Sequence, residues 1–118
     1  ANDARIKSNL AQMRTLSELI YDSNGSAYVK TGAGDVATCF TAATPTAAQC
    51  GNATILANAT SIKNDLTNLS ATVTSTANAT AYCVSAPLKS DTTMKYCVDS
   101  TGKTITSTAS TCASQVCP

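Results

Sequence analysis

The fold is decided by residues 2–21, which read NDARIKSNLAQMRTLSELIY. Large apolar residues recur there at steps of three or four, which is the repeat of one face of an α-helix. They are Ile6, Leu10, Met13, Leu16 and Ile20. Most intervening positions are polar or charged, and Asn24-Gly25 suits the left-handed backbone that ends a helix. The pattern predicts a helix over residues 1–24 with one face buried along its length.

The rest of the chain is poor in large apolar residues. Of the 118 residues in the whole chain, 53 are Ala, Thr or Ser, and only 19 are Leu, Ile, Val or Phe. Such a composition approaches that of disordered chains, but the net charge of +1 is too small for that class. We therefore expect a single domain over residues 1–118 in which the N-terminal helix is the spine that everything else packs against.

Six cysteines supply what the thin core lacks. They are Cys39, Cys50, Cys83, Cys97, Cys112 and Cys117. The chain has no histidine and no C-x-x-C pair, so the spacing does not fit a zinc site. Three disulfides in an oxidising compartment fit better, each contributing about 2–4 kcal/mol. The first two cysteines are expected to close on each other across a surface loop, and the protein is expected to be exported or displayed on the cell surface.

Residues 25–80 form the predicted connection between helix and sheet. Glycines, prolines and an Ala/Thr run break any period in their first half, which predicts a loop. Apolar residues recur at helical steps further on, at Ala59, Ile62, Leu66, Leu69 and Val73. This predicts a short helix over about residues 60–70, followed by a loop over residues 72–80.

Residues 81–107 carry the β signal. Apolar residues alternate with polar ones or cysteine in two runs, Tyr82–Leu88 and Met94–Val98. A hairpin centred on Ser90 would place Tyr82 opposite Val98 and Cys83 opposite Cys97. Residues 103–107 are expected to form the third strand of the same meander. We expect an α+β fold in which the apolar face of a three- to four-stranded antiparallel sheet lies on the spine helix.

The tail, residues 108–118, is expected to fold back over the outer face of the sheet. Its two cysteines allow two arrangements that fit equally well. In one, Cys83 pairs with Cys97 and Cys112 pairs with Cys117. In the other, each tail cysteine is bonded to one of the two strands.

Catalytic chemistry has little support. Without histidine, the commonest general base and the usual nucleophilic triads are missing. Ser85 and Lys89 could form a catalytic Ser–Lys pair, but they fall on a strand and its turn, where a solvated surface is the simpler interpretation. Glu18 is expected to form an ordinary ion pair with Arg14, four residues earlier on the helix. We predict no catalytic residue and no enzyme activity.

No cofactor or metal is expected either. Asp35, Asp91 and Asp99 are the candidates for calcium, but that ion needs six to eight converging oxygens and no aspartate-rich loop is present. Carboxylates that bond their own turns explain these residues better. Arg5, Lys7 and Arg14 give the helix a basic side, yet a net charge of +1 disfavours nucleic acid as a partner.

Two segments together resemble a known family. Residues 3–15, closing on Tyr21-Asp22-Ser23-Asn24-Gly25-Ser26, resemble the second half of the long N-terminal helix of bacterial type IV pilins and pseudopilins. Residues 82–88 and Tyr96-Cys97-Val98-Asp99-Ser100-Thr101-Gly102 resemble a V-S-A-x-L … W/Y-C-V-D-S-T-G pattern of pilin-like proteins. Tyr96 stands where the aromatic residue is often tryptophan. The resemblance covers about half of the chain and leaves residues 28–81 without a match.

The resemblance implies a structural subunit, with a major pilin favoured, of an extracellular type IV pilus. Subunits would assemble with one another into filaments for twitching motility, adhesion to a host cell or surface receptor, or DNA uptake. In that family a hydrophobic half-helix, absent from these 118 residues, anchors the precursor in the membrane and then packs in the filament core. The five apolar residues of the spine helix would join that core to the globular head.

Two other functions stay open. The chain could be a pseudopilin of a type II secretion system, which six cysteines and the lack of an acidic calcium loop disfavour. It could instead be a secreted, disulfide-rich binding or adhesin domain whose helix only looks like that of a pilin.

Overall fold

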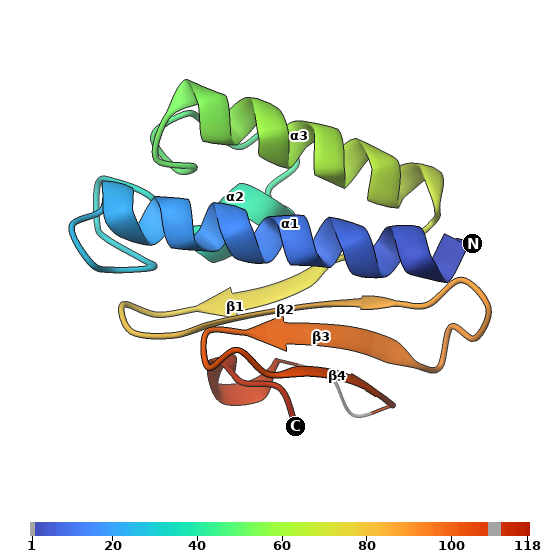
Figure 1. Cartoon of the computed structure of the whole chain (residues 1–118). Coiled ribbons are helices and arrows are strands. Elements are labelled where there is room, and N and C mark those ends of the chain that lie inside the picture. The colour runs from blue at the N-terminus through green and yellow to red at the C-terminus, as the bar shows by residue number, and fades with distance from the viewer. Residues whose placement is uncertain (1, 109–111) are drawn as a thin grey trace.

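The computed structural model of the protein describes residues 2–108 and 112–118, and its fold is α+β (Figure 1). Three helices are followed by four strands and a short 3-10 turn. In chain order these are α1 (Asn2–Ser23), α2 (Val36–Thr41), α3 (Ala53–Asn68), β1 (Thr74–Ala77), β2 (Tyr82–Pro87), β3 (Lys95–Asp99), β4 (Thr104–Ser107) and η1 (Ala113–Gln115). The strands form one antiparallel sheet in the order β1-β2-β3-β4.

The elements form layers on the two sides of this sheet. Helix α1 contacts β2 and β3, α2 contacts β1, and α3 packs on α1 and α2. In Figure 1, α1 lies between α3 and the sheet, and the C-terminal tail lies on the far side of the strands. The helices therefore cover one face of the sheet, while the tail covers the other.

Helix α1 confirms the predicted spine. Its apolar stripe is buried along the whole helix, with exposed fractions between 0% and 5%. Side chains that alternate on β2, namely Tyr82, Val84 and Ala86, belong to the same core. The helix ends where the Asn24 N–H bonds to the Ile20 carbonyl and Gly25 takes a φ of 71°. In residues 2–108 and 112–118, no helix combines the length and the apolar character needed to cross a bilayer.

The connection contains more helix than expected. Residues 36–41, predicted as loop, form α2, because the Asp35 side chain accepts a hydrogen bond from the Thr38 N–H and so caps the helix. Val36 and Phe40, four residues apart, are buried on the same side of this helix.

The second predicted helix is present, but it begins earlier in the chain than predicted. Helix α3 begins at Ala53 instead of about residue 60, and it ends at Asn68. Its cap is Asn52, whose side chain accepts a hydrogen bond from the Ile55 N–H at 2.9 Å. Ile55 continues the apolar stripe from Ala59 toward the N-terminus, but Ile55 and Leu56 are the only large apolar residues in residues 53–60, which leaves little periodic signal in the sequence.

The predicted hairpin register is wrong by two residues. Val84 lies opposite Val98, and Cys97 lies opposite Ser85 instead of Cys83. The reason is a wider turn, because the Leu88 N–H bonds to the Met94 carbonyl and the turn centres on Asp91. A slip of two residues leaves every side chain on its predicted face, so the apolar pattern could not reveal it.

Strand β1 corrects a second prediction. Residues 74–77 read TSTA and were expected to be loop, yet they pair with β2 from Thr74 opposite Ser85 to Ala77 opposite Tyr82. Such a strand has no large apolar residue to produce an alternating pattern. Its position comes from hydrogen bonding to β2 and from α2, which packs against it. The sheet therefore has four strands.

The buried stripe of α1 should dominate the stability. Leu10 is fully buried, whereas Leu19 on the same helix is 45% exposed. We expect Leu10→Ala to lower the free energy of unfolding by about 2–5 kcal/mol, because it removes buried methyl groups and leaves a cavity. The matched control Leu19→Ala should change it by about 0.5 kcal/mol or less. Urea unfolding followed by circular dichroism measures both, and equal effects would contradict this packing.

Candidate functional site

The predicted filament-packing residues lie inside the domain. Ile6, Leu10, Met13 and Ile20 are fully buried, and Leu16 is 5% exposed. Their side chains pack on residues of the sheet and of the other helices, in a single core. They therefore hold the head of the protein on its spine. A contribution of the same residues to filament assembly stays a prediction.

The free side of α1 carries a different feature. A groove between α1 and α3 is lined by Leu16, Leu19 and Ile62, together with the polar side chains of Gln12, Thr15, Asn58 and Ser61. Leu19 is one of two large apolar residues that are substantially exposed in the described chain; the other is Val116 in the tail. This groove is the apolar part of the helix surface that a neighbouring molecule can reach.

The basic side of α1 is used within the molecule. Arg5 forms an ion pair with Asp65 of α3, and the buried Asn9 amide donates to the same carboxylate at 2.7 Å. These hydrogen bonds, that from Asn9 first, lower the pKa of Asp65. The Lys7 ammonium lies over the Tyr96 ring, 5.6 Å from its centroid. Two of the three basic groups therefore already have partners in the head.

All six cysteines are paired. Cys39 is bonded to Cys50, as predicted from their spacing. Of the two arrangements left open for the others, the structure has the one that joins the tail to both strands, with Cys83 bonded to Cys112 and Cys97 bonded to Cys117. Three disulfides indicate an oxidising environment, as found outside the cell.

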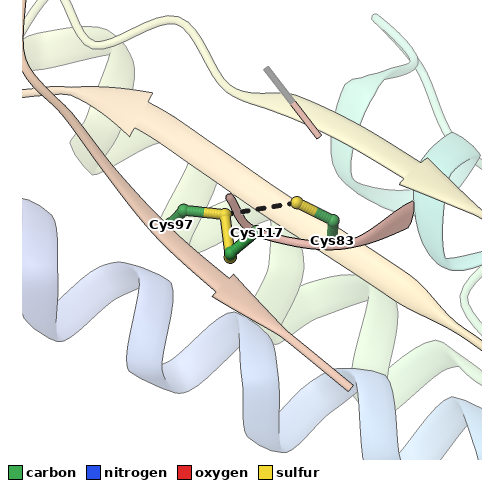
Figure 2. Close-up of side chains that lie close together, drawn as sticks. All are labelled: Cys83, Cys97 and Cys117. Atoms are coloured by element: carbon green, nitrogen blue, oxygen red, sulfur yellow. Dashed lines mark hydrogen bonds between the residues drawn. A yellow bond between two sulfur atoms is a disulfide. The ribbon is translucent and has the colours of Figure 1, made fainter. Parts of the chain in front are cut away.

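The two tail disulfides form one buried cluster on the outer face of the sheet. The Sγ atoms of Cys83 and Cys97 lie 3.3 Å apart, with Cys117 beside them (Figure 2). All four cysteines of the cluster are at most 5% exposed, and Ile105 of β4 packs against them. Three of these sulfur atoms are close enough together to suggest a metal site. Each is already bonded to another sulfur, however, and only a thiolate would be a ligand.

Asp99 holds the tail in place from the end of β3. Its carboxylate is 1% exposed, and it accepts hydrogen bonds from the N–H groups of Thr101 at 2.9 Å, Lys103 at 3.2 Å and Cys117 at 2.8 Å. The Thr101 hydroxyl donates as well. Burial by itself would raise the pKa of Asp99, but these hydrogen bonds outweigh it and the pKa lies below its ordinary value.

The other carboxylates also serve local structure. Asp35 caps α2, and Asp91 accepts from the Thr93 N–H within its own turn. Like Asp99, these two candidates for calcium therefore accept hydrogen bonds from nearby backbone groups. Glu18 accepts a hydrogen bond from the Tyr28 hydroxyl at 2.9 Å, and no ion pair joins it to Arg14 within residues 2–108 and 112–118. Burial, followed by this hydrogen bond, raises the pKa of Tyr28 to about 12.

No hydrogen bond joins Ser85 to Lys89 in the part of the chain that the structure describes. Lys89 is exposed in the turn after β2, where its N–H bonds to Asp3 at 2.8 Å. Ser85 is 1% exposed, so the expectation of a solvated surface is wrong for this residue. It lies on the outer face of β2, which the tail covers, and its hydroxyl has no hydrogen-bond partner within residues 2–108 and 112–118.

Asn24 and Asp3 position loops through side-chain hydrogen bonds that the sequence does not predict. The Asn24 side chain accepts from the Gly34 N–H at 2.8 Å and donates to the Gly34 carbonyl at 2.8 Å. A Cβ at Gly34 would come within 2.8 Å of the Asn24 Oδ1, so only glycine fits there. Asp3 accepts from Lys89 and from the backbone and hydroxyl of Ser90, which ties the start of α1 to the β2–β3 turn.

The pairing of the tail can be read from a tryptic digest under non-reducing conditions. Cleavage after lysine separates residues 64–89, 96–103 and 104–118. Because Cys112 and Cys117 are bonded to different strands, we expect mass spectrometry to find all three peptides covalently joined. Release of residues 104–118 as a separate peptide would mean that Cys83 pairs with Cys97 instead.

Acid should weaken the hydrogen bonds that the Asp99 carboxylate accepts from the turn and from the tail. A carboxylate whose pKa is lowered by folding stabilises the protein above its unfolded pKa, and this contribution is lost as the pH falls through the folded pKa. We expect Asp99→Asn to lower the free energy of unfolding by about 1.5–3 kcal/mol at neutral pH. The difference from wild type should shrink below about pH 4.

The measurement is urea unfolding at several pH values. Asp22→Asn is the matched control, because Asp22 is exposed and makes no side-chain hydrogen bond in the described part of the chain. It should stay within about 0.5 kcal/mol of wild type at neutral pH. The contrary result is that the free energies of unfolding of wild type and Asp99→Asn differ by the same amount from neutral to acid pH. That result would rule out the carboxylate as the source of the stabilisation.

Comparison with known proteins identifies no family for this chain. No protein-family model, no curated protein and no solved structure matches it. The functional conclusion therefore rests on the sequence motifs and on the geometry described above, in which a helix spine, a four-stranded sheet and a disulfide-bonded tail leave the groove at Leu19 exposed.

Proposed function

We propose that this domain is the globular head of a structural subunit, a pilin, of a bacterial type IV pilus. The observation that carries the proposal is the arrangement of α1. The helix lies along the sheet with one face wholly buried, and its N-terminal end lies at the edge of the domain (Figure 1). Helical chain continuing outward from that end would leave the head without meeting the sheet.

The contacts near that end suit a junction between a filament core and a head. Asp3 is bonded to the β2–β3 turn, and Arg5 is paired with Asp65 of α3. Force applied along α1 would therefore pass directly into both the sheet and the second long helix. In the proposed subunit, an apolar helix continuous with α1 anchors the precursor in the membrane and later packs with its copies in the filament core.

The covalent bonds suit the outer surface of such a filament. The Cys39–Cys50 bond closes the connection, and two more bonds fasten the tail to the sheet. A surface of this kind resists proteolysis and shear, because its loops cannot open without breaking a disulfide. Attachment to a host cell or another surface, and twitching motility, are the roles that this proposal includes.

The first test is the mature N-terminus of the native protein. Filaments are sheared from cells, and the subunit is analysed by intact mass and N-terminal peptide mass spectrometry. We expect a mature chain with an apolar run of about 20 residues upstream of Ala1, in material that forms fibres under the electron microscope. A mature chain that begins near Ala1 would overturn the proposal and favour a secreted binding domain.

A variant of the exposed groove sharpens the same test. Leu19→Glu places a charge in the groove between α1 and α3, where a neighbouring subunit would pack. We expect a lower yield of sheared filaments with an unchanged unfolding midpoint of the head. Thr31→Glu is the matched control, since it adds the same charge at an exposed loop position. Short, periplasm-restricted filaments in wild type would indicate a pseudopilin instead.

A further inference from the structure

The two edges of the sheet are not equivalent. Strand β1 has α2 and η1 packed against it, whereas β4 shares a sheet ladder only with β3 among residues 2–108 and 112–118. Residues 104–107 read TITS, with no charge, no proline and two β-branched threonines around Ile105. Natural sheets usually protect an edge with lysine, proline or a bulge, because an open edge pairs readily with another strand. Strand β4 has none of these within its length.

The unpaired groups of this edge can be assigned from the turn that precedes it. The Asp99 N–H bonds to the Lys103 carbonyl at 3.2 Å, which makes these two residues a hydrogen-bonded pair. Such pairs alternate along an antiparallel ladder, so Ile105 and Ser107 direct their backbone groups toward β3. Thr104 and Thr106 direct theirs outward, and no hydrogen bond to these groups occurs in residues 2–108 and 112–118.

We propose that β4 pairs with β4 of a second copy of this chain, antiparallel and around a two-fold axis at Ile105. In this register Thr104 lies opposite Thr106 of the second copy, so the outward donors and acceptors of each strand meet those of the other. Ile105 meets its own copy in a non-hydrogen-bonded pair, where side chains are closest. Threonine pairs and β-branched pairs are favourable across strands.

Charge favours the same register. Lys103 is the nearest charged residue to the edge, and it would lie opposite Ser107 of the second copy, away from the second lysine. A slip of two residues toward the turn would bring the two Lys103 side chains closer to each other, which like-charge repulsion disfavours. The helices do not interfere, since α1 lies over β2 and β3 and adjacent strands are separated by about 4.8 Å.

The expected contact is short and therefore weak. Two strands of this length share few hydrogen bonds and bury less surface than a stable interface needs. Pairing should appear at high protein concentration, or where copies are already held side by side. The inference is independent of the filament proposal, because it uses the opposite edge of the molecule from the groove at Leu19.

The test is amide hydrogen exchange by NMR on the wild-type domain at micromolar and at millimolar concentration. We expect the N–H groups of Thr104 and Thr106 to exchange about tenfold or more slowly at the higher concentration, as burial in a ladder requires. The amides of Thr92 and Thr93, in an exposed turn, serve as internal controls and should not change. Equal exchange at Thr104 and Thr106 at both concentrations, with a monomeric diffusion coefficient, would overturn the inference.

A pair of variants at one position separates the backbone from the side chain. Thr106→Pro removes an outward N–H without touching the ladder to β3, which is the kind of edge position that proline tolerates. Thr106→Val keeps the N–H and the β-branched shape. In sedimentation equilibrium we expect Thr106→Val to associate like wild type and Thr106→Pro to remain monomeric. Association of both variants alike would show that the contact lies elsewhere.

Discussion

Two disulfides fasten the C-terminal tail to β2 and β3, and they cover the face of the sheet that the helices leave open. An antiparallel sheet can leave its second face to water, but here the tail covers that face, and the chain has few large apolar side chains to pack there. Two disulfides take the place of an apolar layer on this face. Four buried cysteines and Ile105 form the outer cluster, while almost all the large apolar residues of the described chain serve the inner core.

Buried polar side chains also hold the tail and the loops in place. Asp99 binds the turn at the end of β3 and the backbone of Cys117 at once, so the carboxylate and the Cys97–Cys117 bond hold the same few residues. Asn24 performs a similar task after α1, where its amide bonds both backbone groups of Gly34. These buried groups have several partners each, which is the condition under which burial of a polar group is tolerated. Their role is to position loops.

The two proposals use different surfaces of this framework. Filament assembly would use the exposed groove at Leu19, between α1 and α3, together with chain upstream of α1. Strand pairing would use the outward groups of Thr104 and Thr106, at the far edge of the sheet. A subunit held in an array through the first surface could present the second to a neighbour, although neither contact requires the other. The rigidity that the disulfides confer benefits both, because a rigid surface loses less entropy on binding.

Much of the framework was predictable from the sequence alone. The spine helix follows from an uninterrupted apolar period between Ile6 and Ile20, and the alternation around Tyr82 and Tyr96 assigns the inner faces of β2 and β3 correctly. Both signals are strong because large side chains must all reach one core. The pairing of Cys39 with Cys50 also followed from the sequence, since a short loop leaves few alternatives.

Tertiary structure decided the rest, for identifiable reasons. Strand β1 is built from Thr, Ser and Ala alone, and the first half of α3 has only Ile55 and Leu56 as large apolar residues, so both carry little periodic signal and their neighbours and caps determine their structure. The hairpin register differs from the predicted one by two residues. The apolar pattern could not distinguish the two registers, because such a slip preserves every face and only the width of the turn differs. The same wider turn moved Cys83 out of line with Cys97. Contacts of the tail with Thr76 and Asp99 then place Cys112 beside β1 and β2 and Cys117 beside β3, which selects the disulfides that the sequence left open.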